Sequence, residues 1–269
     1  MRYLQNLHTH TTYADGRDTP EEMLLAALER GFDSIGFSEH STSRSPRSPG
    51  EERLASYRAE IRALAEKYAG QIDVFCGLEV DTEYEGQANG YDYLIGSMHF
   101  LHDGGGRFPV DGSVEQVENN LRFFGSGLAF AKAYFRDLCE LPAHGRFDIV
   151  GHFDLAAKNV ERMPLFDMDD PAYLRAGIEA IDALAGKIPF FEVNTGAISR
   201  GYRTSPYPAP AFLRAFRERG FGAVITSDCH DARFLDCGFA DAAELLRSCG
   251  FKERFILTRE GFKAVSLDE

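Results

Sequence analysis

Short apolar runs rich in β-forming residues alternate with helix-like segments along this 269-residue chain, and this alternation limits its fold more than any other feature. Seven of the runs end in polar residues: RYLQNLHTH, FDSIGFSEH, IDVFCGLEV, YDYLIGSMH, FDIVGHFD, PFFEVNTG and FGAVITSDCH. Strands that alternate with helices form parallel βαβ units, and seven or eight units on one chain indicate a barrel. RFILT, at residues 254–258, is a possible eighth strand.

The segments between these runs carry helix boundary signals. TPEEMLLAALERGF begins with Thr19 as its predicted cap, places Pro20 at the first helical position, and stops at Gly31. LASYRAEIRALAEKYAG repeats apolar residues at intervals of three and four and ends at Gly70, and DPAYLRAGIEAIDALAG and APAFLRAFRERGFG repeat the formula. No linker-like or low-complexity stretch divides the chain, so we expect residues 1–269 to form one α/β domain.

Two segments depart from this regular pattern. Residues 41–52, STSRSPRSPGEE, read as a loop, and residues 101–146 begin with LHDGGGRFPVDGS and continue through a long helical stretch. Long insertions at one end of a barrel commonly shape the substrate pocket, whereas the alternative for each segment is a disordered surface loop. We expect an insertion at about 101–146.

Charge and composition exclude several classes of partner. The net charge of -13 argues against nucleic acid, because binding to a phosphate backbone depends on clustered Lys and Arg. The sequence contains no apolar run of about 18 residues, so no membrane span is predicted. It also has no secretory apolar core at its N-terminus and an odd five cysteines without CxxC spacing, which is typical of a cytoplasmic protein.

Polar residues with metal-binding side chains gather at the predicted strand ends. These residues are His8, His10, Glu39, His40, Glu79, His99, His152, Asp154, Glu192, Asn194, Asp228 and His230. Six of the eight histidines are among them, and the other two, His102 and His144, lie in the insertion. In a parallel barrel the carboxyl ends of the strands converge on one face, where active sites are found.

Each of these residues has an ordinary explanation when it is taken alone. His40 could be a loop histidine, His99 a core histidine, Glu79 a rim charge and Asp228 a helix cap. One metal site, however, explains all of them together, and imidazoles with carboxylates suit Zn, Mn or Fe(II). So many ligands suit two or three ions, with Glu79 or Asp228 as natural bridges. Paired ions about 3.5–4 Å apart activate a shared water and clamp a phosphoryl group.

Seven motifs, in order along nearly the whole chain, resemble the polymerase and histidinol phosphatase (PHP) family: LHTHTTYADG, FSEHS, GLEVD, GSMHF, GHFDL, EVNTG and TSDCHD. FPVDGS, GHFDLAAKN and EVNTGAISRGYRTSPYP are most similar to its histidinol-phosphate phosphatase branch. The resemblance implies a distorted (β/α)7 TIM-like barrel with a trinuclear metal centre at the C-terminal ends of the strands. It assigns one ion to His8, His10, Glu79 and Asp228, a second to Glu79, His99 and His152, and a third to Asp15, His40 and His230.

The same resemblance implies a metal-dependent phosphatase that hydrolyses L-histidinol phosphate in histidine biosynthesis. Activated water would attack phosphorus in line, and either Asp228 or His230 would protonate the leaving alkoxide. Lys158 and either Arg200 or Arg203 would hold the phosphate, with Arg17 as a weaker candidate. An acidic protein can attract the cationic parts of such a small substrate while metals hold its anion.

Two other functions remain open from the sequence. One is a phosphoesterase that acts on nucleotides or nucleic-acid ends, as other branches of the family do, and a groove lined with Lys and Arg would favour it. The other is a barrel without catalytic activity that serves as a binding or regulatory module. That second function requires lost ligands, and all nine are present in this chain.

Overall fold

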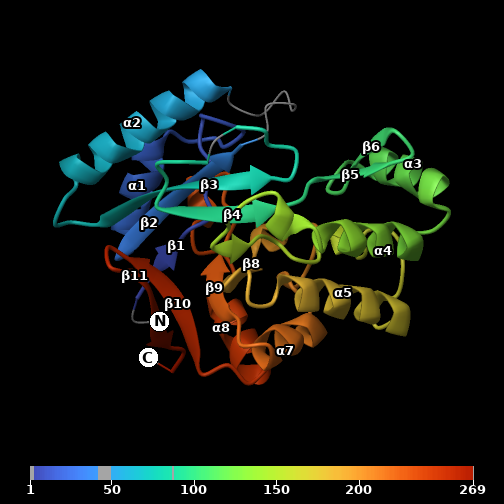
Figure 1. Ribbon diagram of the computed structural model, residues 1–269. Coiled ribbons are helices and arrows are strands. Elements are labelled where there is room, and N and C mark those ends of the chain that lie inside the picture. Colours follow the sequence, from blue (N-terminus) through green and yellow to red (C-terminus); the bar gives the residue numbers. More distant parts are fainter. Residues whose placement is uncertain (1–2, 42–49, 87, 269) are drawn as a thin grey trace.

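The computed structural model describes residues 3–41, 50–86 and 88–268, and seven parallel strands form its centre (Figure 1). They neighbour one another in the order β1 (Gln5–Asn6), β2 (Ser34–His40), β3 (Asp73–Asp81), β4 (Tyr93–Ser97), β7 (Ile149–Val150), β8 (Phe190–Asn194) and β9 (Gly222–Thr226). A parallel bridge between Thr9 and Cys229, just beyond β1 and β9, joins the two edges. The predicted distorted (β/α)7 barrel is confirmed.

Helices cover the outside of the barrel. They are α1 (Pro20–Glu29), α2 (Glu51–Lys67), α5 (Pro171–Leu184), α7 (Pro210–Glu218) and α8 (Phe239–Ser248), with a short α6 (Gly196–Ser199) after β8. The predicted start of α1 is present, because Thr19 Oγ1 accepts from the Glu22 N–H at 3.3 Å and the Glu22 carboxylate accepts from the Thr19 N–H at 2.8 Å. This reciprocal cap satisfies backbone donors that a helix start leaves open.

Tyr93 fills the interior of the barrel below the strand ends. Its hydroxyl donates to the carbonyls of Leu7 and Phe37 and so ties β4 to β2 and to the residue that follows β1. Gly36 and Gly77 lie against its ring, and a Cβ at either position would overlap the ring atoms. Because the interior is packed, a binding site has room only at the end of the barrel where the strands have their carboxyl ends.

An insertion arm follows β4, and we define it as residues 100–138. It consists of β5 (Phe100–Asp103), β6 (Gly106–Pro109), α3 (Val114–Phe124) and α4 (Gly127–Leu138), at the right of Figure 1. The two strands pair as an antiparallel hairpin, and α4 packs against α5. Rings of Phe108 and Phe123 lie 4.3 Å apart and hold α3 on the hairpin. The arm occupies most of the predicted 101–146 insertion.

The possible eighth barrel strand was the wrong interpretation. RFILT lies in β10 (Glu253–Thr258), which pairs antiparallel with β11 (Gly261–Ser266) in a separate sheet. The side chain of Gln5 bonds both the N–H and the carbonyl of Leu257, at 2.7 and 2.8 Å. Because β1 and β9 extend to close the barrel with each other, no edge remains for a further strand.

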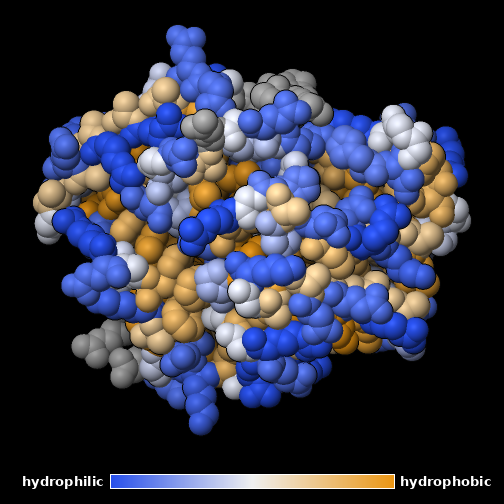
Figure 2. Space-filling model, in the orientation of Figure 1, coloured by the Kyte–Doolittle hydropathy of each residue, from blue (hydrophilic) through white to orange (hydrophobic). Residues whose placement is uncertain are grey.

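Most of the predicted 41–52 loop, residues 42–49, lies outside the described residues. Figure 2 shows hydrophilic side chains over much of the visible face, with apolar residues gathered in places between them. Within the described ranges, no helix combines the length and the apolar content that a membrane crossing requires.

Candidate metal centre

A cavity of about 860 Å³ opens at the carboxyl ends of the strands. Predicted metal ligands line one part of it and the insertion arm lines another. The barrel side contributes Asp15, His40, His99, His152, Leu155, Lys158, Arg200, Tyr202, Asp228 and His230, and the arm side contributes Phe100, Arg107, Pro109, Asp111, Gly112, Ser113 and Gln116.

Glu79, at the end of β3, lies at the centre of the cluster. Its carboxylate oxygens are 2.7 Å from His40 Nδ1 and 2.9 Å from His152 Nε2. The Nε2 atoms of His8, His10 and His99 each lie 3.5 Å from it. One buried carboxylate therefore contacts five imidazoles, as a ligand that bridges two ions would.

His8 and His10 follow β1 and point to one side, as their spacing predicts. Their Nε2 atoms are 3.1 Å apart, and Asp228 Oδ1 lies 3.6 Å from the first and 3.3 Å from the second. Asp228 has a φ of 45°, the left-handed region that residues other than glycine rarely adopt. This turn after β9 presents the Asp228 carboxylate to the two histidines that follow β1.

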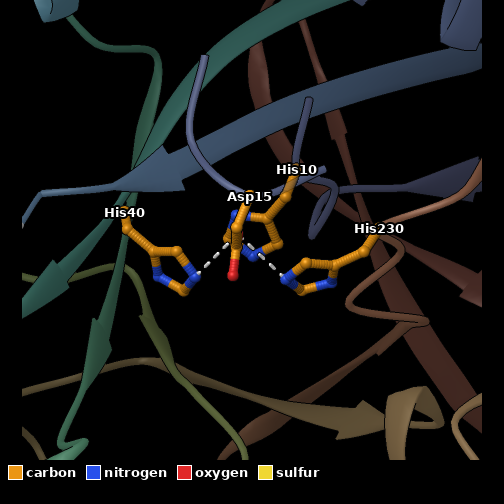
Figure 3. Close-up of side chains that lie close together, drawn as sticks. All are labelled: His10, Asp15, His40 and His230. Atoms are coloured by element: carbon orange, nitrogen blue, oxygen red, sulfur yellow. Dashed lines mark ion pairs between the residues drawn. The ribbon is translucent and has the colours of Figure 1, made fainter. Parts of the chain in front are cut away.

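Asp15 lies between His40 and His230, with its Oδ1 at 3.4 and 3.2 Å from their Nε2 atoms (Figure 3). It belongs to the tight turn after His10, where the N–H of Gly16 donates to the Thr11 carbonyl at 2.9 Å. The backbone approaches Gly16 so closely that a Cβ there would overlap the His10 carbonyl. The Asp-Gly pair of the sequence thus aims Asp15 into the cluster.

Contacts of 2.7–3.6 Å link all nine predicted ligands into one cluster. The cluster contains three overlapping groups of residues, and within each group the donor atoms lie within 4.8 Å of one another. The groups are His10 with Asp15, His40 and His230; His8 with His10 and Glu79; and His40 with Glu79 and His99. Imidazole nitrogens and carboxylate oxygens at this density fit divalent transition-metal ions.

The pKa shifts show how strongly these groups interact. Burial alone raises the pKa of Glu79, but the surrounding imidazoles of His8, His99 and His40 outweigh burial and hold that pKa well below its usual value. Burial, with His40 and His230 nearby, lowers the pKa of His10 to about 3. Glu79 is therefore ionised and His10 neutral, as metal binding requires. Burial lowers the pKa values of His8, His40 and His99, but the surrounding carboxylates outweigh burial and raise them, so these imidazoles would release protons when a metal binds.

Three further carboxylates support the imidazoles from behind. Glu192 Oε2 lies 2.8 Å from His8 Nδ1, and Asp81 Oδ2 lies 2.8 Å from His99 Nδ1. Glu39 accepts from the N–H and the hydroxyl of Thr11, and its other oxygen is 3.9 Å from His10 Nδ1. Such partners fix the orientation of metal-binding imidazoles.

The sequence pattern identifies two of these three supporting carboxylates as strand-end residues and does not identify the third. Glu39 and Glu192 are among the strand-end residues, but nothing in the sequence assigns them a role. Asp81 was missed, although it lies two residues after Glu79 on the same strand face, a spacing that could have identified it.

Two of the four predicted phosphate-binding cations line the cavity. Lys158 donates to the carbonyl of Asp111 at 2.8 Å, and Arg200 contacts the carboxylate of Asp228 at 2.8 Å. Arg203 is buried, lies 3.8 Å from Asp154 and does not line the cavity. Arg17 has 71% of its side chain exposed, pairs with Asp231 and likewise lies outside the lining.

A family model described as the PHP domain matches residues 6–196, more than half of the chain. The chain belongs to the PHP family. The resemblance stated from the motifs is thereby confirmed. The matched range contains seven of the nine predicted ligands, and Asp228 and His230 lie beyond it.

Relatives that match over most of both chains are named as histidinol-phosphatases. A probable histidinol-phosphatase of Deinococcus radiodurans is 32% identical over 93% of this PHP chain and 95% of its own. The histidinol-phosphatase of Bacillus subtilis is 26% identical over 89% and 97%. The solved structure of histidinol phosphate phosphatase from Lactococcus lactis, complexed with zinc, L-histidinol and phosphate, superposes with a TM-score of 0.74. It is 21% identical and covers 96% of this chain and 98% of its own, which supports the fold.

Proposed function

We propose that this PHP protein is a metal-dependent phosphomonoesterase that hydrolyses L-histidinol phosphate to L-histidinol and phosphate in histidine biosynthesis. One observation carries the proposal: a cluster of imidazoles and carboxylates shares a single cavity with two cations, Lys158 and Arg200. The names of the full-length relatives, and the histidinol and phosphate in the Lactococcus lactis complex, support this substrate.

The cluster would hold two or three divalent ions, of zinc, manganese or iron. The proposed ligands are His8, His10, Asp15, His40, Glu79, His99, His152, Asp228 and His230. Their number exceeds what one ion accepts, and Glu79 contacts members of every donor group. Zinc in the related Lactococcus lactis structure is consistent with this set.

Bound ions supply Lewis acidity at the phosphoryl group and lower the pKa of water at the site. The residues of the chain position the substrate around that chemistry. Lys158 and Arg200 line the cavity and would bind phosphate oxygens, as charge-assisted bonds to a dianion favour. Asp228 and His230 also line it and are the two candidate proton donors for the leaving alkoxide. Arg17 and Arg203 are left out of this proposed set because neither lines the cavity.

A phosphate-release screen tests the proposal. The purified protein, loaded in turn with manganese, zinc or iron, is given about twenty phosphomonoesters, and elemental analysis measures bound metal. We expect kcat/KM for L-histidinol phosphate to exceed that for p-nitrophenyl phosphate or a nucleoside monophosphate by at least about tenfold, because remote contacts contribute in the transition state. A chelator should abolish turnover. A 5′-nucleotide or oligonucleotide as the better substrate would overturn the histidinol assignment.

A further inference from the structure

An ion pair crosses the cavity from the barrel to the insertion arm. Lys158 follows the short 3-10 helix Leu155–Ala157 after β7, and Asp111 lies between β6 and α3. The Lys158 ammonium lies 2.8 Å from the Asp111 carbonyl and 3.4 Å from its carboxylate. The Lys158 side chain is 11% exposed and that of Asp111 is 38% exposed, so a molecule in the cavity can reach the carboxylate.

A phosphate held by Lys158 would disturb this pair. If Lys158 turns its ammonium to the phosphate, the carboxylate of Asp111 loses its counter-charge inside the cavity. An uncompensated charge away from bulk water is unfavourable, and its cost opposes binding. A substrate that brings its own cation can restore the balance.

We propose that Asp111 binds the ammonium group of the substrate and thereby selects phosphomonoesters that carry a cation. In the free protein, Lys158 and Asp111 pair with each other. With substrate bound, Lys158 pairs with the phosphate and Asp111 pairs with the ammonium. This inference rests on the proposed function, since it names the residue that reads the alcohol part of the substrate.

The surroundings of Asp111 hold it in place for this role. The N–H of the preceding Val110 donates to the His99 carbonyl at 2.8 Å, which ties the arm to the metal-ligand cluster. On the other side, Ser113 and Gln116 form a reciprocal cap at the start of α3. A carboxylate fixed on both sides loses little freedom when a ligand binds it, which favours a specificity role.

The selectivity of Asp111→Asn tests the proposal. We expect kcat/KM for L-histidinol phosphate to fall at least about tenfold, because a hydrogen bond between two charged groups is lost. Turnover of p-nitrophenyl phosphate, which has no ammonium group, should change far less. Inhibition by the product L-histidinol should weaken, whereas inhibition by inorganic phosphate should not. The Lys158 bond to the Asp111 backbone carbonyl survives this substitution, so the arm stays tethered.

Asp103→Asn is the matched control. Asp103 lies in the same arm, pairs with Arg136 and is 39% exposed, but it does not line this cavity. Its variant should keep the selectivity of the unaltered protein. Thermal melting of both variants reports on folding.

Two results would overturn the role of Asp111. One is an equal loss on both substrates, which indicates a general part in metal binding or proton transfer. The other is unchanged selectivity. If the unaltered protein does not prefer L-histidinol phosphate, the proposed function fails separately. O-phosphoethanolamine compared with ethyl phosphate then still tests ammonium binding, and a preference lost in Asp111→Asn supports the inference.

Discussion

The cluster of the nine predicted metal ligands and the insertion arm face each other across one cavity, but their side chains are held in different ways. His8, His10 and Glu79 in the cluster are at most 1% exposed and come from the ends of barrel strands. In the arm, Arg107 and Asp111 are 36% and 38% exposed, and each pairs with a residue of the barrel. The barrel thus fixes the chemistry, whereas the arm can vary the choice of substrate.

The difference also sets the size of the effects to expect. A charge removed from a buried network leaves its partners uncompensated, which costs several kcal/mol. A half-exposed ion pair contributes about 0–1 kcal/mol because water screens it. Substitutions in the cluster should therefore remove metal and activity together. Substitutions in the arm should change substrate preference and leave the metal in place.

Glu79→Gln should give the largest effect. Its carboxylate contacts five imidazoles, so we expect lower metal content and a loss in kcat/KM of at least about a thousandfold, beyond the roughly 10- to 100-fold typical of supporting residues. Elemental analysis and phosphate release measure the two quantities. Glu115→Gln, an exposed substitution at the start of α3, is the control and should behave as the unaltered protein. Full metal content with full activity in Glu79→Gln would disprove the central position of this residue.

His99 and His102 provide a closer comparison, because they lie three residues apart on either side of the boundary between cluster and arm. His99 contacts Glu79 and Asp81, whereas His102, in the hairpin, is 51% exposed and bonds Glu83, which follows β3. We expect His99→Ala to lose at least about a hundredfold in rate, as loss of metal-site support commonly does. His102→Ala should lose far less. Equal losses of rate for the two variants would show that the cluster and the arm do not differ in function at this point of the chain.

The fold and the cluster could be predicted because both depend on periodic patterns. Strand alternation places His8 and His10 on one side, and parallel strands bring their carboxyl ends together. Asp15 and Asp228, far apart in the sequence, therefore both contact His230. Neither statement needs the exact packing of side chains. The prediction of an eighth barrel strand was wrong because an apolar run does not indicate whether the strand pairs with a barrel edge or within a hairpin.

The cations could not be assigned from the sequence, since Arg200 and Arg203 follow the same strand and are three residues apart. The turn of α6 brings Arg200 to Asp228, while Arg203 packs over the ring of Tyr207 beside Asp154. Which one enters the cavity depends on contacts between distant segments. Asp111 escaped notice for the same reason, because its ion pair with Lys158 joins residues 47 positions apart.

Arg107 in the hairpin should show the smallest effect. Its guanidinium makes two bonds of 2.7 Å to Glu83 and lies 3.3 Å from the ring centre of Phe100, at the arm side of the cavity. Arg107→Met keeps an apolar stem against that ring and leaves Glu83 its bond to His102. The lost pair is partly screened by water, so the hairpin should loosen only slightly.

We therefore expect Arg107→Met to raise KM for L-histidinol phosphate by less than about tenfold, because a half-exposed pair contributes at most about 1 kcal/mol. Metal content and kcat should stay unchanged, since no predicted ligand contacts Arg107. Steady-state kinetics and elemental analysis measure these quantities. Arg136→Met, on α4 and outside the cavity lining, serves as the control and should leave KM unaltered. If Arg107→Met loses metal, the arm supports the cluster directly, and the division between a chemical barrel and a selective arm is wrong.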